Sequence, residues 1–243
     1  MVGETPRLKT KGVEAVDKAL RILSLFDSRT SILSLHEISS RSGLVKSSAL
    51  RLLVSLRDAG FVAMMPDKRY TVGAEAFRIS CAYRQNLGLE ELIRPALRRL
   101  VSATGESGSF FRREGHRRIC LFREDTDQLL REHVAEGDAV EVSKGAAGHV
   151  FEEFEKEDGD RPADTDRLMA LPIVSLGERG PGIAGISAPV FALDQGLIGA
   201  LALSGPRTRF TEARIEQMKP LVVQSARDVS KALRSPFYDL LDG

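Results

Sequence analysis

Residues 33–72 constrain the fold of this chain more than any other segment, because they carry the pattern of two short helices followed by a hairpin. We expect the first helix over residues 35–41 and the second over residues 45–59. Residues 42–44 form a short turn between them, and its glycine suits a tight reversal between packed helices. The spacing is typical of a helix-turn-helix, in which the second helix enters the major groove of DNA.

The second of these helices has two chemically different faces. Its apolar residues recur at i, i+3, i+4 and i+7 and therefore share the face that packs on the core; they are Ala49, Leu52, Leu53 and Leu56. The first turn and the opposite face carry short hydroxyls and cations, which suit phosphates and base edges. The residues that we assign to DNA contact on this helix are Lys46, Ser47, Ser48 and Arg51.

A hairpin follows the second helix. Gly60 ends that helix, residues 61–65 and 69–72 read as two strands, and residues 66–68 form the turn between them. Lys68 and Arg69 lie at the tip, where they would reach the DNA backbone. The alternative is a small helical subdomain whose basic residues are only solvated.

The charge of the chain is unevenly distributed, although the net value is only +1. Residues 1–80 hold 13 basic against 8 acidic residues, a balance of +5, and the remainder holds 22 against 26, a balance of −4. A basic N-terminal third indicates a small DNA-binding module fused to a second domain. The imbalance is mild, so it supports the motif rather than standing alone.

Length and composition describe an ordinary globular protein of one large or two modest domains. The chain has 243 residues, of which 42% are hydrophobic and 28% charged. No apolar run approaches the ~20 residues that a membrane span needs, so we expect no membrane partner. Only Cys81 and Cys120 occur, without metal-ligand spacing, which favours a reducing cytoplasm over a disulfide framework.

Helical patterns flank the motif on both sides. From Val13 an amphipathic helix ending near residues 27–28 would complete a three-helix core. Beyond the hairpin we expect two helices, over residues 75–84 and 89–104, with Pro95 kinking or restarting the second. We interpret this stretch as a linker that joins two domains and can pair with its copy in a dimer.

From Gly105 the periodicity changes from helical to strand-like. Strands are expected, in chain order, over residues 107–111, 119–122, 129–134, 139–142, 183–191 and 197–203. A short helix starts in the run 144–151, and Thr211 caps a final helix that ends near residue 234. The sum is a mixed sheet flanked by helices, an α+β domain of the ligand-sensing type.

An acidic run separates the short helix from the last strands. Residues 152–166 contain eight acids against Lys156 and Arg161. Such a run is most simply a solvated loop. Its spacing lacks the glycine punctuation of a calcium loop, so we expect no metal site.

Several colinear motifs of the chain resemble those of the IclR family of bacterial transcription regulators. They are VEAVDKALRIL from residue 13, KSSALRLL from 46, RYTVG from 69, GIAGISAPVF from 182, ALSGP from 202 and RFT from 209. The resemblance implies an α+β protein with an N-terminal winged helix-turn-helix (1–73), a helical linker (74–104) and a C-terminal GAF-like mixed α/β effector domain (105–243). It also implies homodimers or homotetramers on palindromic operators of double-stranded DNA, with a small carboxylate or aromatic acid as effector.

The same resemblance implies roles for the basic residues of the motif. Ser47, Ser48 and Arg51 fall where the family reads DNA, and Lys46 and Arg69 fall near phosphates. Two positions depart from the family pattern. Position 45 is valine where a proline is common, and position 48 is serine where threonine is usual; neither should prevent docking.

An effector pocket is expected at the start of the short helix. Free N–H groups and the positive end of the helix dipole favour an anion at Ala146, Ala147 and Gly148, and His149 follows directly. The family places its ligand there and against the two C-terminal strands, which corresponds here to Gly185, Ser187, Ala202 and Ser204. Because some members carry polar groups where this chain has small residues, we expect a roomier, less polar pocket for a bulkier or partly aromatic acid. Alternatively, these small residues only ease packing.

Motifs of enzymes are missing from the sequence. It contains no nucleophile elbow, phosphate-binding glycine loop or HExxH, so we expect no catalytic residues and no cofactor. Cys120 and Cys81 are interpreted as small hydrophobes. Two other functions stay open: a ligand-converting domain fused to a DNA-binding head, and an architectural protein that binds DNA irrespective of sequence.

Overall fold

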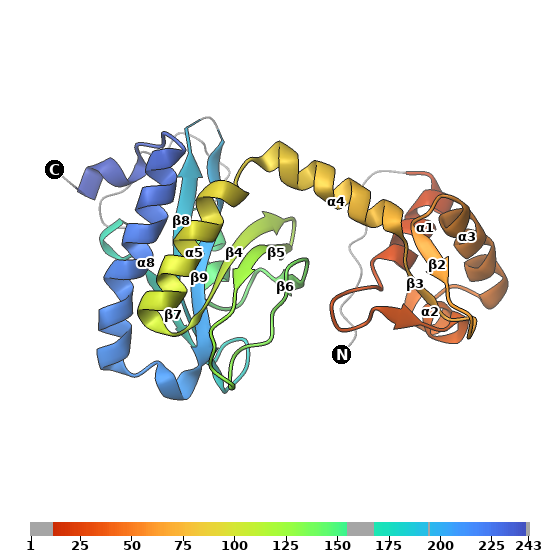
Figure 1. The fold of residues 1–243 in the computed structure, drawn as a ribbon, viewed down its shortest axis with the longest axis horizontal. Coiled ribbons are helices and arrows are strands. Elements are labelled where there is room, and N and C mark those ends of the chain that lie inside the picture. Colours follow the sequence, from red (N-terminus) through yellow and green to blue (C-terminus); the bar gives the residue numbers. More distant parts are fainter. Residues whose placement is uncertain (1–11, 155–167, 194, 242–243) are drawn as a thin grey trace. The chain divides into compact units, whose positions relative to one another are not determined.

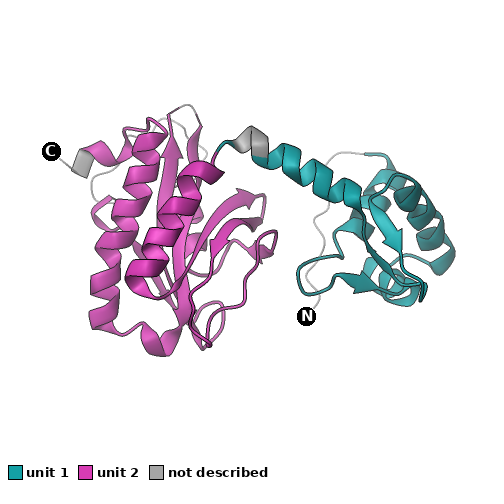
Figure 2. Cartoon of the chain, in the orientation of Figure 1, with its two compact units in different colours: residues 1–88 teal, residues 89–243 magenta. Residues whose placement is uncertain are grey.

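The computed structural model describes residues 12–154, 168–193 and 195–241. The chain divides into two compact units, residues 1–88 and 89–243 (Figure 2). The boundary lies between α4 (Ala74–Leu87) and α5 (Glu90–Thr104), inside the stretch that the sequence assigned to a linker. Since the two linker helices fall in different units, the expected borders at residues 73 and 104 stay a prediction.

The first unit combines short helices with a small antiparallel sheet (Figure 1). Its elements before α4 are α1 (Glu14–Leu23), β1 (Ile32–Leu33), α2 (Leu35–Ser42), α3 (Lys46–Asp58), β2 (Val62–Met64) and β3 (Tyr70–Val72). The strands lie in the order β1-β3-β2. Ile22, Ile38, Leu53 and Tyr70 join the three helices and the sheet in one core, which supports the winged arrangement expected from the sequence.

Local signals fix both ends of α2. The Ser34 hydroxyl accepts the N–H of Glu37 at 3.2 Å, and the Glu37 carboxylate accepts the N–H of Ser34 at 2.8 Å, which is a capping box. Gly43 follows the helix with a φ of 71°, the left-handed conformation that favours glycine. The chain therefore reverses within one turn, and α2 packs directly against α3.

Two features of the first unit differ from the expectation. Helix α1 ends at Leu23 rather than near residues 27–28, because the Asp27 carboxylate accepts the N–H groups of Arg29 and Thr30 at 2.9 and 2.7 Å and favours a turn there. The sequence pattern also missed β1, which is too short for an alternation to show. Because β1 pairs with β3, the returning strand of the hairpin is the central strand of its sheet.

The second unit is a six-stranded sheet with helices on both faces (Figure 1). Its strands are β4 (Ser107–Glu114), β5 (Arg117–Glu124), β6 (Ala139–Glu141), β7 (Ile173–Leu176), β8 (Ile183–Ala192) and β9 (Gly196–Pro206), in the order β6-β5-β4-β9-β8-β7. Helices α5 and α8 (Glu212–Ala232) cover one face, and α6 (Ala146–Phe154) packs on the other. Two 3₁₀ turns, η1 (Arg207–Arg209) and η2 (Phe237–Leu241), flank α8.

The alternation of side chains along the strands separates the two faces. Phe111, Cys120 and Ala200 form a buried cluster with residues of α6. A β-bulge in the β4–β5 register lies between Cys120 and Phe122, so Phe122 points to the opposite face although it is only two positions further on. There Phe122 lies under Arg94 of α5, with the guanidinium 5.4 Å from the ring centre. The face that carries α6 is the one that bears the candidate pocket.

Two expectations about the second unit are wrong, and of the two outcomes expected at Pro95, a kink or a restart, the restart does not occur. Residues 129–134 form no strand; they belong to an irregular segment, residues 125–138, that we call the strap. Local hydrogen bonds shape it instead, for example where the Asp138 carboxylate accepts the N–H of Ala135 at 2.9 Å, and Leu129 is fully exposed. All strand pairings of the described sheet are antiparallel rather than mixed. Helix α5 runs continuously through Pro95.

Part of the acidic run falls beyond what the structure describes. Glu152 and Glu153 belong to α6, whereas residues 155–167 lie outside the described residues. Within the described ranges, no helix is both long and apolar enough to cross a bilayer.

The close pairing of β4 with β9 depends on a glycine. A Cβ at Gly199 would lie 2.3 Å from the Phe110 ring and 2.5 Å from the Phe111 carbonyl oxygen. We therefore expect Gly199→Ala to lower the free energy of unfolding by about 1–3 kcal/mol, measured by urea denaturation. Gly182→Ala is the matched control, because a Cβ there meets nothing within 4 Å. Equal stability of the two variants would contradict this account.

Candidate functional site

Helix α3 presents a mixed polar and apolar face to solvent. Lys46, Ser47 and Arg51 are exposed and Ser48 is half-buried, while the apolar face of the helix is held in the core of the first unit. Leu50 and Val54 share the outer face and are 44% and 41% exposed. A surface of hydroxyls, cations and branched apolar groups on one helix can contact phosphates, base edges and thymine methyl groups.

The hairpin tip carries one paired and one protruding cation. Arg69 donates from Nε to Asp67 Oδ2 at 2.7 Å, and its N–H bonds the other oxygen of the same carboxylate at 3.1 Å. These hydrogen bonds hold the pKa of Asp67 below its ordinary value. Lys68 is exposed with a φ of +63°, and it has no ion pair among the described residues. Asp67 therefore partly neutralises the positive charge of Arg69, which leaves less of that charge to attract a phosphate.

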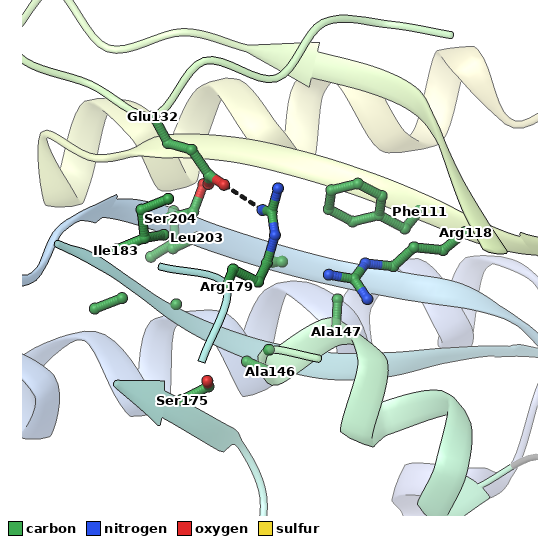
Figure 3. Close-up of a pocket in the computed structure, with 14 residues that line it drawn as sticks. Phe111, Arg118, Glu132, Ala146, Ala147, Ser175, Arg179, Ile183, Leu203 and Ser204 are labelled. Carbon is green, nitrogen blue, oxygen red and sulfur yellow. Dashed lines mark hydrogen bonds and ion pairs between the residues drawn. The ribbon is translucent and has the colours of Figure 1, made fainter. Parts of the chain in front are cut away.

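A hollow that is open to solvent lies on the α6 face of the sheet (Figure 3). Five of the residues predicted for an effector line it: Ala146, Ala147, Gly185, Ala202 and Ser204. Three others, Gly148, His149 and Ser187, do not. Seven further lining residues were not predicted from the sequence: Phe111, Arg118, Glu132, Ser175, Arg179, Ile183 and Leu203. The small residues expected to make this pocket less polar therefore share it with two arginines and a glutamate.

Arg118 is the most deeply buried of these charged side chains. It is 1% exposed, and Nη1 donates to the carbonyls of Glu141 and Val142 at 2.5 and 3.4 Å. The guanidinium lies 5.3 Å from the centre of the Phe111 ring. Burial, and then the charge of Arg179, lower the pKa of Arg118 to about 10, so it stays cationic at neutral pH. Its Nε is buried and has no hydrogen-bond partner among the described residues.

Glu132 and Arg179 form an ion pair across the hollow (Figure 3). Glu132 comes from the strap and Arg179 from the loop between β7 and β8. Arg179 Nη1 donates to Glu132 Oε1, and the side chain of Glu132 is only 3% exposed. The second oxygen, Oε2, is buried without a partner in the described part of the chain.

The structure gives Gly148 and Ser187 packing positions instead. A Cβ at Gly148 would lie 2.1 Å from the carbonyl oxygen of Val142 and 2.9 Å from Arg118 Nη1, so this glycine lets α6 approach the end of β6. Ser187 is fully buried and its hydroxyl donates to the carbonyl of Leu201 at 2.9 Å. Neither side chain position is open toward the hollow.

His149 is held beside the start of α6 by two carboxylates. Its Nδ1 lies 3.0 Å from Glu152 and its Nε2 lies 2.6 Å from Glu178, which also accepts the N–H of Gly145 at 3.0 Å. Burial alone would lower the pKa of His149, but the bonds to Glu152 and Glu178 outweigh it and raise the pKa above 6.5. The N–H of Gly145, and then His149, hold the pKa of Glu178 below 4.5.

One sequence signal could have identified Arg118. In RRICLFRE the buried positions of β5 alternate, and Arg118 shares its face with Cys120. A charged residue at an inward position of an apolar alternation is unusual and indicates a functional or ion-paired site. Glu132 and Arg179 leave no such signal, because both come from irregular segments. Within the described residues, no group of three or more His, Cys, Asp or Glu side chains is arranged so that it could hold a metal ion.

Two separate parts of the chain each match a model of the same protein family. Residues 15–64 match the family model of the IclR helix-turn-helix domain, and residues 173–231 match that of the C-terminal domain of the bacterial transcriptional regulator IclR. The first match includes α3 and ends before Lys68. The second includes Arg179 and strands β7 to β9, but Arg118 and Glu132 lie outside it.

Relatives and solved structures match over most of their length. The HTH-type transcriptional regulator BhcR of Paracoccus denitrificans is 29% identical, over 90% of this chain and 87% of that protein. The transcriptional repressor IclR of Escherichia coli is 22% identical, over 92% and 91%. A putative IclR transcriptional regulator from Silicibacter has a TM-score of 0.75 at 19% identity, over 91% and 96%. An IclR homolog from Microbacterium hydrocarbonoxydans, complexed with 4-hydroxybenzoate, has a TM-score of 0.74 at 15% identity, over 91% and 99%.

The contacts of His149 predict a pH-dependent contribution to stability. Because the pKa of His149 is raised on folding, its stabilising charge is fully present below the ordinary value of 6.5 and is lost as pH rises through the raised value. Glu178 stays ionised there, since its pKa is lowered. We expect His149→Gln to lower the melting temperature most at about pH 5.5 and less at about pH 8.5.

The matched control for this experiment is His116→Gln, in the exposed β4–β5 turn. It should shift the melting temperature little, and by a similar amount at both pH values. A His149→Gln effect that is the same at both pH values would rule out the charged pair.

Proposed function

The chain belongs to the IclR family of bacterial transcriptional regulators, and we propose that it is a cytoplasmic repressor that binds a palindromic operator under the control of a small organic acid. The observation that carries the proposal is the combination of two sites in one chain. One is the exposed face of α3 in a winged helix-turn-helix. The other is a buried guanidinium, Arg118, that faces a hollow without a carboxylate bonded to it among the described residues.

On DNA, α3 would act as the recognition helix. We assign base contacts to Ser47, Ser48 and Arg51, and phosphate contacts to Lys46, Lys68 and Arg69. The exposure of the first turn of α3 supports this, because Val45 provides no side-chain cap and the leading N–H groups stay available to a phosphate. Arg69 would contribute less than Lys68, since Asp67 already pairs with it.

A second copy of the chain is the partner that we propose for the exposed apolar side chains of the first unit. Val16 and Leu20 of α1 are 51% and 54% exposed, and Phe77 of α4 is 72% exposed. Pairing would remove these side chains from water, and a twofold dimer matches a palindrome because each head reads one half-site. A homodimer is the smallest assembly that satisfies this argument, and a homotetramer built from two such dimers satisfies it equally.

The effector would bind in the hollow beside α6. A carboxylate there would meet Arg118 and the leading N–H groups of α6, at Ala146 and Ala147, which have no acceptor within the helix. The relative from Microbacterium binds an aromatic acid, and its similar fold supports an acid as the class of ligand here. We propose no catalysis, because burial raises the pKa of the Cys120 thiol to about 12 and His149 is held outside the hollow.

Contacts of the strap would carry the effector signal to the linker. Glu132 lines the hollow, and its carbonyl accepts Arg123 Nη2 at 2.8 Å. The N–H of Arg123 bonds Glu136 at 3.0 Å, and Glu136 pairs at 2.9 Å with Arg94 of α5. Since α4 immediately precedes α5 in the chain, we propose that residues 74–104 act as the linker through which ligand binding shifts the population of DNA-binding states.

Selection and footprinting of genomic fragments at ~150 mM salt test the proposed function. We expect a protected palindrome. Binding without a preferred site, with and without metabolite extracts, would contradict the proposal and favour the architectural protein.

Arg51 and Lys68 should affect operator binding differently. Arg51→Ala is expected to weaken specific binding by roughly 1–3 kcal/mol and to relax preference at its base position, because a guanidinium reads base edges. Lys68→Ala should weaken binding to all sequences alike, because a phosphate contact carries no sequence information. Fluorescence anisotropy with operator and scrambled duplexes measures both. If Arg51→Ala weakened binding to both duplexes equally, Arg51 would not be a base-contacting residue.

Arg94 allows a test of the linker. In addition to Glu136, it pairs with Glu90 at 2.6 Å and Glu124 at 3.4 Å. With an acid that shifts operator binding of the unchanged protein, Arg94→Gln should bind that acid normally but lose most of the shift, which is typically about 5- to 150-fold. Arg98→Gln, on the same helix but 67% exposed, is the control and should keep the shift. A full shift in Arg94→Gln would place the coupling elsewhere.

A further inference from the structure

We infer that the effector is a monocarboxylic acid that also carries a hydrogen-bond-donating hydroxyl group, with the acid bound by Arg118 and the hydroxyl by Glu132. This inference rests on the proposed control by an organic acid and specifies its chemistry. The structure supports it through the charge of the hollow, through two buried atoms that lack partners, and through the separation of those atoms on different elements.

The net charge of the residues that line the hollow favours a ligand with a single negative charge. Its lining holds two cations, Arg118 and Arg179, and one anion, Glu132, so one positive charge is uncompensated within the lining. A monocarboxylate neutralises it. A dicarboxylate would bring an extra negative charge beside Glu132, and a zwitterionic amino acid would leave the excess unchanged. Both cost free energy beside Arg118 and Glu132, which are only 1% and 7% exposed.

Two orphaned atoms specify what the ligand must offer. Arg118 Nε is a buried donor and Glu132 Oε2 is a buried acceptor, and both lack a hydrogen-bond partner among the described residues. An unsatisfied buried polar group is destabilising, so a ligand that satisfies both gains affinity at each. The required groups are an acceptor for Arg118 and a donor for Glu132.

The placement of these groups decides which part of the ligand meets which residue. Arg118 comes from β5 and lies beside the start of α6, where Ala147 also lines the hollow, so positive potential gathers on that side (Figure 3). Glu132 belongs to the strap, and its Oε1 already accepts a hydrogen bond from Arg179. A carboxylate on that side would be repelled. Phe111 and Ala202 also line the hollow and offer apolar surface for the body of the ligand, while Arg179 lies between Arg118 and Glu132 (Figure 3).

Calorimetric titration of the full chain with matched acids tests the inference. One series is 4-hydroxybenzoate, benzoate and 4-methoxybenzoate, and the other is lactate, propionate and pyruvate. In at least one series the hydroxy acid should bind about tenfold or more tightly than both partners, because only it donates a hydrogen bond. If acids bind with no preference for the hydroxyl, the inference fails while the acid effector stands. If no acid binds, both fail.

Glu132→Gln separates a direct contact from a general effect. Glutamine keeps an oxygen for Arg179 and puts a donor NH₂ where Oε2 was, so the preference for hydroxyl over the acceptor-only methoxy or oxo analogue should fall to about twofold or less. Glu114→Gln is the control, since this carboxylate at the end of β4 is 60% exposed and outside the hollow, and it should keep the preference. A preference that survives in Glu132→Gln overturns the inference. Should that variant not fold, the titrations of the unchanged protein decide.

Discussion

A guanidinium buried on the apolar face of the sheet is the constraint that the rest of the second unit accommodates. Removing the charge of Arg118 from water is costly, and the carbonyls of Glu141 and Val142 and the Phe111 ring offset only part of it. The carbonyl of Val142 also lies where a side chain at Gly148 would begin. Arg118, the end of β6 and the start of α6 are therefore interlocked, and Gly148 is explained by packing without any ligand contact.

The same arrangement explains how a pocket lined by small residues can recognise a polar ligand. Gly185 and Ala202 provide no side-chain hydrogen bonds, so the polar groups come from outside the two C-terminal strands. They come from β5, from the strap and from the β7–β8 loop, through Arg118, Glu132 and Arg179. Two of these three segments are irregular, and one of them, the strap, also contacts α5. The strap would then both contact the ligand and transmit the effect of ligand binding to α5.

The sequence predicted the first unit well because its signals are local. The period of the helices, the turn at Gly43 and the hairpin after Gly60 each act within a few residues, whereas β1 was too short to show a period. The pocket was only half predictable. Ala146 and Ala147 follow from helix-start chemistry, but Glu132 lies in a segment mistaken for a strand, because its apolar neighbours Leu129 and Leu130 are exposed rather than buried. Side chains that come together only through tertiary contacts have no characteristic spacing in the sequence, so the sequence pattern does not predict them.

The charges of the first unit bear on whether DNA binding is specific. At least four of the eleven cations in the described part of this unit are in surface ion pairs: Lys18 with Glu14, Arg57 with Asp58, Arg69 with Asp67 and Arg78 with Glu75. Sequence-indifferent binding draws its affinity from many phosphate contacts, and these ion pairs reduce the positive charge that is available for them. The exposed face of α3 instead combines Arg51 with the apolar side chains of Leu50 and Val54, which suit base edges and thymine methyls. A head of this composition gains affinity mainly where the bases match, which favours a regulator of chosen sites over an architectural protein.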